Sequence, residues 1–189
     1  MMKCLQKFCC TLLVFIFGGG QIMANEVDLR ISDDTIHGNY AATTDTTLFG
    51  LGYLYKNADS SINIINTDFH VRGQTAIGNL PMTVSMGFQG NFFKEEEFKG
   101  STVGLGGSLR VNIPEALGLS IETALHYAPE VLSFGDADEF RRFRVQMNYH
   151  IIQNADISAG YHYLNAGHED AKSNHTFESG LFLGMKLKF

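Results

Sequence analysis

The sequence predicts an all-β protein, an antiparallel up-and-down transmembrane β-barrel of about ten strands. Three observations predict it. Apolar and polar residues alternate in segment after segment, several of these segments are longer than the strands of soluble proteins, and none of their apolar faces carries a charge. A strand that crosses a bilayer sets one face on lipid and the other on the barrel interior, which produces this alternation. An even count depends on a turn at Asp33-Asp34, and eight strands is the alternative.

The first 24 residues differ from the rest and are predicted to be a secretory signal peptide. Lys3 and Lys7 precede a short apolar run, and Ile22-Met23-Ala24 supplies a cleavage site after Ala24. That run is too short to span a bilayer. We therefore expect two parts, a signal peptide over residues 1–24 and an outer-membrane barrel over residues 25–189.

Composition supports an exported membrane protein and excludes some other classes. All 3 cysteines lie in the predicted signal peptide, so the mature chain forms no disulfide, as is ordinary for a bacterial envelope protein. The net charge of −6 argues against a nucleic-acid binder. The mean hydropathy of −0.03 is too polar for a helical membrane protein. Charged residues make up only 18% of the chain, which is a low fraction for a soluble protein.

The predicted strands follow one another with turn residues between them. The first two are short, the third has an aromatic face, and the strictest alternation is found over residues 82–92, 103–113, 143–151 and 179–189. Turn-forming Gly, Pro, Asn and Asp residues separate the segments. In chain order the ten expected strands are Val27–Ile31, Ile36–Ala42, Phe49–Tyr55, Ile65–Val71, Met82–Phe92, Val103–Ile113, Leu119–Tyr127, Phe143–Ile151, Ile157–Tyr163 and Ser179–Phe189.

The connections alternate in length, as they do in outer-membrane barrels with short periplasmic turns and long outer loops. With the N-terminus in the periplasm, the periplasmic connections are Thr43–Thr47, Gly73–Pro81, Pro114–Gly118 and Gln153–Asp156. The outer connections include Lys94–Gly100, Pro129–Glu139 and Ala166–His175, which are longer and carry acidic residues. We expect an acidic outer rim.

The segment His126–Phe134, with the sequence His-Tyr-Ala-Pro-Glu-Val-Leu-Ser-Phe, precedes acidic residues and the strand from Arg142. This segment resembles the YfaZ family, as do the Asp33-Asp34 turn and Ala159-Gly160-Tyr161. The YfaZ proteins are predicted outer-membrane proteins of Gram-negative bacteria. The resemblance therefore implies an outer-membrane location and a barrel fold, and it implies no activity or catalytic residue.

The chain ends in an aromatic residue, Phe189, on the apolar face of the last strand. This arrangement resembles the C-terminal assembly signal of bacterial outer-membrane proteins. We expect the partners to be outer-membrane lipid, lipopolysaccharide and the barrel assembly machinery, and we expect no nucleic acid.

Strand parity places long polar side chains inside the barrel, where we expect them to pair and fill the lumen. The expected polar lumen network is Asp68, His70, Arg72, Arg110, Glu122, His126, Arg142, Arg144, His150 and His162. No motif indicates a catalytic, cofactor or metal site, and the glycines around Gly106 are interpreted as thinning the lumen face of a strand or marking a bend in it.

The favoured function is therefore a small outer-membrane barrel with a salt-bridged lumen and a structural or loop-mediated binding role. Two alternatives stay open. A narrow pore that weakly favours anions would use a surplus of basic lumen residues. A lipid-modifying enzyme within the membrane would use His126 with Ser120 or Glu122. We expect no enzyme.

Overall fold

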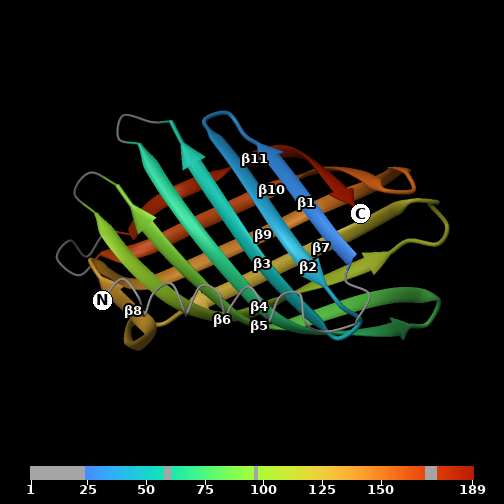
Figure 1. Ribbon diagram of the computed structural model, residues 1–189, viewed down its shortest axis with the longest axis horizontal. Helices are drawn as coiled ribbons and strands as arrows, with labels where there is room; N and C mark the ends of the chain where they lie inside the picture. The colour runs from blue at the N-terminus through green and yellow to red at the C-terminus, as the bar shows by residue number, and fades with distance from the viewer. Residues whose placement is uncertain (1–23, 58–60, 96–97, 169–173) are drawn as a thin grey trace, which may run out of the picture.

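The computed structural model describes residues 24–57, 61–95, 98–168 and 174–189. Within these residues, ten strands form one closed antiparallel barrel (Figure 1). Each expected strand overlaps one of them, so the prediction of ten strands is confirmed and the alternative of eight is wrong. The barrel strands are β1 (Ala24–Ile31), β2 (Thr35–Thr43), β3 (Thr47–Lys56), β4 (Ile62–Ile77), β5 (Leu80–Lys94), β6 (Lys99–Asn112), β7 (Leu119–Ala128), β9 (Ala137–Ile152), β10 (Ala155–His168) and β11 (Asn174–Lys188).

Each strand of the barrel pairs with the strand before it and the strand after it in the chain, and β1 pairs with β11 to close the barrel. The expected up-and-down order is therefore confirmed. At the closing seam, the backbone N–H of Asn25 donates to the Phe189 carbonyl at 3.0 Å, and the Phe189 N–H donates back to the Asn25 carbonyl at 2.9 Å. We call this end of the barrel the terminal end and the opposite end the loop end.

The longest expected connection at the terminal end differs from its prediction. The expected connection Gly73–Pro81 is mostly strand, because β4 continues to Ile77, β5 begins at Leu80, and Ala76 pairs with Pro81. The turn consists of Gly78 and Asn79, with Gly78 at φ 59°. Residues 73–81 are exposed on both faces, so this tip of the hairpin has no apolar face and alternation could not reveal it.

The segment that resembles the YfaZ family forms an ordered connection at the loop end. After Pro129 the chain makes one 3₁₀ turn, η1 (Glu130–Leu132), and then a short strand, β8 (Ser133–Gly135), that pairs with β6 beyond the end of β7. The Pro129 carbonyl accepts hydrogen bonds from the Leu132 N–H at 2.9 Å and from the Ser133 hydroxyl at 3.1 Å. The Lys99 N–H donates to the Asp136 carboxylate at 2.8 Å, which fixes the far end of the connection.

Part of the expected acidic rim lies outside the described residues, namely Glu96, Glu97, Glu169 and Asp170.

The outer face of the barrel is apolar on every strand. A side chain from each of the ten strands is more than 40% exposed, and such a continuous apolar surface is unfavourable in water and suited to lipid. These side chains are Leu29, Tyr40, Leu51, Phe69, Met86, Leu105, Leu125, Met147, Ile157 and Leu183.

No helix in the described part of the chain is long and apolar enough to cross a membrane.

The interior has two regions, and the sequence predicted only one of them. At the loop end the lumen is filled by an apolar cluster that we call the aromatic plug, with Phe93 packed against Phe98, Phe140 and Phe177 at ring-centroid distances of 5.4, 6.2 and 5.2 Å. Its other members are Leu54, Ile62, Ile64, Ala128, Ala137, Leu164 and Ala166. Most of these residues lie on the lumen-facing parity near the strand ends, whereas Phe98 precedes β6 and Phe177 lies where the register between β10 and β11 shifts. The expectation of a polar lumen therefore fails at this end of the barrel.

A charged side chain on the outer face tests the lipid contact. Leu105 lies in the middle of β6 and is 52% exposed. In lipid vesicles, Leu105→Arg should lower the free energy of unfolding in urea by about 2–4 kcal/mol, because a buried arginine is costly near the bilayer midplane. The matched variant Leu117→Arg, at an 87% exposed site in the terminal-end connection, should change it by less than about 1 kcal/mol. Equal effects would contradict the bilayer placement.

Candidate functional site: the polar lumen

Below the aromatic plug, the barrel encloses a polar cavity of about 110 Å³. All ten strands contribute side chains to its wall. The cavity is smaller than the roughly 300–1,000 Å³ of a pocket for a drug-sized ligand, and it is large enough for an ion or a few water molecules. The site can therefore hold small species only.

The cavity wall is balanced in charge. Four acidic side chains, Glu26, Asp28, Asp68 and Glu122, face four basic ones, Arg30, Arg142, Arg144 and Lys186. Four histidines complete the ionisable groups of the wall: His37, His70, His126 and His162. The surplus of basic lumen residues expected from the whole sequence is absent from this wall.

The middle of the lumen is held by ion pairs between neighbouring strands or along one strand. Buried charges need partners, because an unpaired charge in a dry interior costs several kcal/mol. The pairs that line the cavity are Arg144–Glu122 at 2.6 Å, Arg30–Asp28 at 3.2 Å and Lys186–Glu26 at 3.5 Å.

Near the terminal end, a single carboxylate joins three strands other than its own. The side chain of Asp156 on β10 is 1% exposed and lies 2.6 Å from His150 Nδ1, 2.7 Å from Lys188 Nζ and 3.4 Å from Arg110 Nη2. The sequence placed Asp156 in the connection Gln153–Asp156, but β10 begins at Ala155. Strand parity could have placed Asp156 in the lumen, because it lies two residues before Ser158 and therefore on the same polar face.

On the plug side of the cavity, Glu178 of β11 is buried between two partners. The Thr35 hydroxyl donates to its Oε1 at 2.5 Å, and His162 Nδ1 lies 2.9 Å from its Oε2. The His37 ring stacks on His162 with a centroid distance of 6.2 Å. This group fixes β2, β10 and β11 to one another just below the plug.

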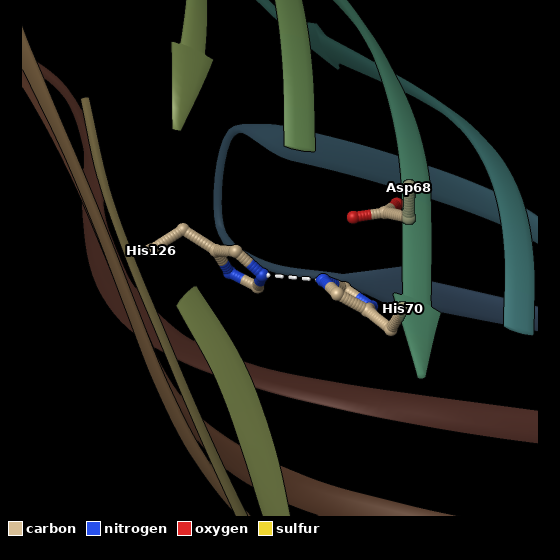
Figure 2. A group of neighbouring side chains, drawn as sticks. All are labelled: Asp68, His70 and His126. Carbon is tan, nitrogen blue, oxygen red and sulfur yellow. Dashed lines mark hydrogen bonds between the residues drawn. The ribbon is translucent and has the colours of Figure 1, made fainter. Parts of the chain in front are cut away.

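Across the cavity, two histidines from strands that are not neighbours meet (Figure 2). His70 of β4 and His126 of β7 approach with their Nε2 atoms 2.9 Å apart. Asp68 lies two residues before His70 on the same face of β4, and its carboxylate accepts hydrogen bonds from Gln89 at 2.6 Å and Asn66 at 2.8 Å.

The contacts of His126 differ from the catalytic dyad considered for an enzyme. Ser120 accepts a hydrogen bond from Arg110 Nε at 3.1 Å, and Glu122 pairs with Arg144. Among the described contacts of His126, the close polar partner is His70.

The structure distributes the expected lumen residues over distinct places. Arg110 and His150 meet at Asp156, whereas Arg72 is half-buried opposite Ser85 and outside the cavity wall. The residues of the expected network that line the cavity are Asp68, His70, Glu122, His126, Arg142, Arg144 and His162. Sequence reasoning did not single out Asn66 and Gln89, which hold Asp68, because amides on a polar strand face carry no distinctive pattern.

The model of one protein family, described as the YfaZ precursor, matches residues 2–189. The chain belongs to the YfaZ family. The resemblance found in the His126–Phe134 segment is therefore confirmed, and the family's description as a precursor agrees with a cleaved signal peptide in an outer-membrane protein. In this YfaZ barrel the Tyr-Ala-Pro-Glu stretch runs from the end of β7 into η1, and the β8 strand that follows pairs with β6.

Several solved structures of outer-membrane barrels are similar to this YfaZ chain. Neisserial surface protein A is 12% identical with a TM-score of 0.38, over 88% of this chain and 94% of that one. OmpT, an outer membrane protein of Vibrio cholerae in its trimer form, is 13% identical with a TM-score of 0.37, over 82% of this chain and 56% of that one. The translocator domain of the autotransporter NalP from Neisseria meningitidis is 14% identical with a TM-score of 0.30, over 100% and 96%. No curated protein matches the chain.

Replacing the shared carboxylate tests the terminal-end network. Asp156→Asn should lower the free energy of unfolding by about 3 kcal/mol, because it leaves three basic groups facing a neutral amide. The three basic side chains are partly exposed, so the loss is expected at the lower end of the range for breaking a buried ion pair. The control Glu139→Gln removes the more exposed pair with Arg141 and should cost less than about 1 kcal/mol. Urea unfolding of both variants in the same vesicles measures the difference, and equal losses would contradict a buried network.

Proposed function

We propose that this YfaZ protein is a closed, non-conducting outer-membrane barrel with a structural role, and that it holds its loop-end connections at the cell surface for binding. The observation that carries the proposal is the aromatic plug. Leu54, Ile64, Phe140, Leu164 and Phe177 are 0% exposed, so apolar side chains fill the loop end of the lumen and exclude water from it.

The polar lumen below the plug supports the same proposal. Arg144 and Glu122 pair across neighbouring strands and Arg30 pairs with Asp28 along β1, and the balanced wall gives no reason for an anion to be preferred over a cation. Long side chains that pair and fill a narrow lumen strengthen the barrel and leave no continuous path for solutes. No observation favours the narrow pore, and the contacts of His126 do not favour a lipid-modifying enzyme.

The ordered connection between β7 and β9 supports a binding role at the surface. Val131 is 80% exposed and Phe134 is 55% exposed. The backbone of Phe134 pairs with β6, and Val131 lies in the η1 turn, which the hydrogen bond from the Leu132 N–H to the Pro129 carbonyl closes. An apolar side chain on a rigid, solvent-facing connection loses little entropy when it binds a partner. Lipopolysaccharide and outer-membrane lipid are the proposed surroundings, and recognition of Phe189 by the barrel assembly machinery is the proposed route of insertion.

Conductance measurements test the closed lumen. The mature protein, refolded without a tag and inserted into planar bilayers, should give no steady current steps, because plug and ion pairs together close the lumen. Its heat-dependent shift in gel mobility verifies folding, and a porin inserted in the same membranes serves as the positive control. Reproducible single-channel steps from the folded protein would overturn the proposal of a closed barrel.

Cysteine labelling tests surface presentation, because the mature chain has no cysteine of its own. Val131→Cys should react with a membrane-impermeant maleimide on intact cells. The matched variant Leu117→Cys, 87% exposed at the terminal end, should react only after the outer membrane is permeabilised. Labelling of Leu117→Cys on intact cells, with Val131→Cys protected, would reverse the proposed orientation.

A further inference from the structure

The meeting of His70 and His126 depends on a row of four residues across four adjacent strands. His70 of β4 pairs with Gly87 of β5, Gly87 pairs with Gly106 of β6, and Gly106 pairs with His126 of β7. The two histidines are thus three strand spacings apart, about 14 Å between backbones. Their imidazoles cover this span by lying over the two glycines. Figure 2 shows the two rings pointing toward each other.

Glycine is required at both intervening positions. A Cβ on Gly87 would lie 2.6 Å from His70 Cδ2 and would collide with the Phe69 carbonyl oxygen. A Cβ on Gly106 would lie 2.6 Å from His126 Cδ2 and would collide with the Leu125 carbonyl oxygen. The barrel wall is therefore free of side chains between the two imidazoles, and each ring is confined to the space above a glycine.

Asp68 completes a set of three metal-binding groups. One ligand atom from each of Asp68, His70 and His126 lies within 4.8 Å of the other two. With metal–nitrogen distances of 2.0–2.1 Å, two ligands of a tetrahedral Zn²⁺ are about 3.4 Å apart, so the imidazole nitrogens at 2.9 Å need to separate only slightly. Two histidines and one carboxylate are a set that divalent transition metals accept, with a fourth position left for water from the cavity.

The amides around Asp68 are those expected behind a metal-binding carboxylate. Gln89 and Asn66 donate to the Asp68 carboxylate and orient it, as residues that support metal ligands do. Both amides are at least nine-tenths buried, and neither amide oxygen has a hydrogen-bond partner among the described residues. The Nδ1 of the buried His126 has none there either. Water or an ion in the cavity can supply the partners that these three atoms lack.

The charge around the site admits a cation. Asp68 and Glu122 face Arg142 and Arg144 in the same cavity, so these four groups sum to zero with the imidazoles neutral. Arg142 pairs in register with His126, and its charge opposes a metal there. The deprotonated imidazole nitrogens and the carboxylate offset that opposition by direct bonds to the metal.

We propose that Asp68, His70 and His126 bind one divalent transition metal ion, with Zn²⁺ chemistry, inside the lumen. The site goes beyond the proposed function, because a closed barrel is expected to be non-conducting with or without a metal. A bare hydrogen-bonded histidine pair that only fills the lumen is the competing explanation.

Metal titration of the refolded mature chain tests the proposal. The protein carries no histidine tag, and metal is present during refolding so that access to the closed lumen does not limit loading. Co²⁺ is the spectroscopic probe, and Zn²⁺ is the competitor. We expect one Co²⁺ per chain with the visible absorption bands of a four- or five-coordinate ion, and loss of these bands when Zn²⁺ is added.

Variants separate the proposed site from incidental binding. His70→Ala and His126→Ala should each weaken Co²⁺ affinity by about 100-fold or more, and Gln89→Ala by about 10- to 100-fold, because it frees the carboxylate that it orients. His150→Ala removes a partly exposed histidine at the terminal end and should leave the affinity unchanged. The heat-dependent shift in gel mobility checks that every variant is folded.

Three outcomes would overturn the proposal. The folded wild-type protein could fail to take up Co²⁺, which leaves the histidine pair as lumen filling. Uptake could persist in both His70→Ala and His126→Ala. It could also be lost in His150→Ala, which would place the ion at the His150–Asp156 pair instead.

Discussion

The structure depends on one constraint, that a sheet in lipid must satisfy all its backbone hydrogen bonds by closing on itself. Lipid offers no partner to a free strand edge, so the ten strands form a ring and β1 meets β11. Closure then sets the direction of every side chain, alternately to lipid and to the lumen. The side chains that point to lipid form the apolar outer face. Those that point to the lumen form the aromatic plug and the paired charges.

The two regions of the lumen solve the same filling problem with opposite chemistry. At the loop end, Phe93, Phe140 and Phe177 exclude water by packing. In the middle, ion pairs such as Glu122–Arg144 satisfy charges that water no longer reaches freely. A barrel filled only with apolar residues would lack the strand alternation that distinguishes lumen from lipid, so the polar half also specifies which face is inside.

The strands could be predicted from sequence because their period is local, and alternation over residues such as 82–92 needs no knowledge of the neighbours. Register could not be predicted. The meeting of His70 and His126 depends on three hairpin connections, and the first of them was expected to be Gly73–Pro81 although the turn is only Gly78-Asn79. Because each turn sets the pairing of the strands that it joins, an error in one connection hides every contact across several strands.

The local nature of the alternation pattern also explains why the positions of Asp156 and of the aromatic plug were not predicted. Asp156 was assigned to a turn because the turn residues before it dominate that stretch, although its parity fits the lumen face of β10. The plug was missed because Leu54 and Phe93 have aromatic neighbours near the strand ends, where the pattern gives no direction, and because Phe177 lies at a register shift between β10 and β11 that reverses its parity.

The β1–β11 seam has a consequence for how the barrel forms. It is the shortest pairing in the barrel, with six residues in register from Glu26 to Ile31, and it joins residues from opposite ends of the chain. Contacts so distant in sequence form late, since the entropy of closing the longest loop must be overcome first. We therefore expect the seam to be the last pairing to form and the first to separate. Its formation is the step that converts an open sheet into a closed ring.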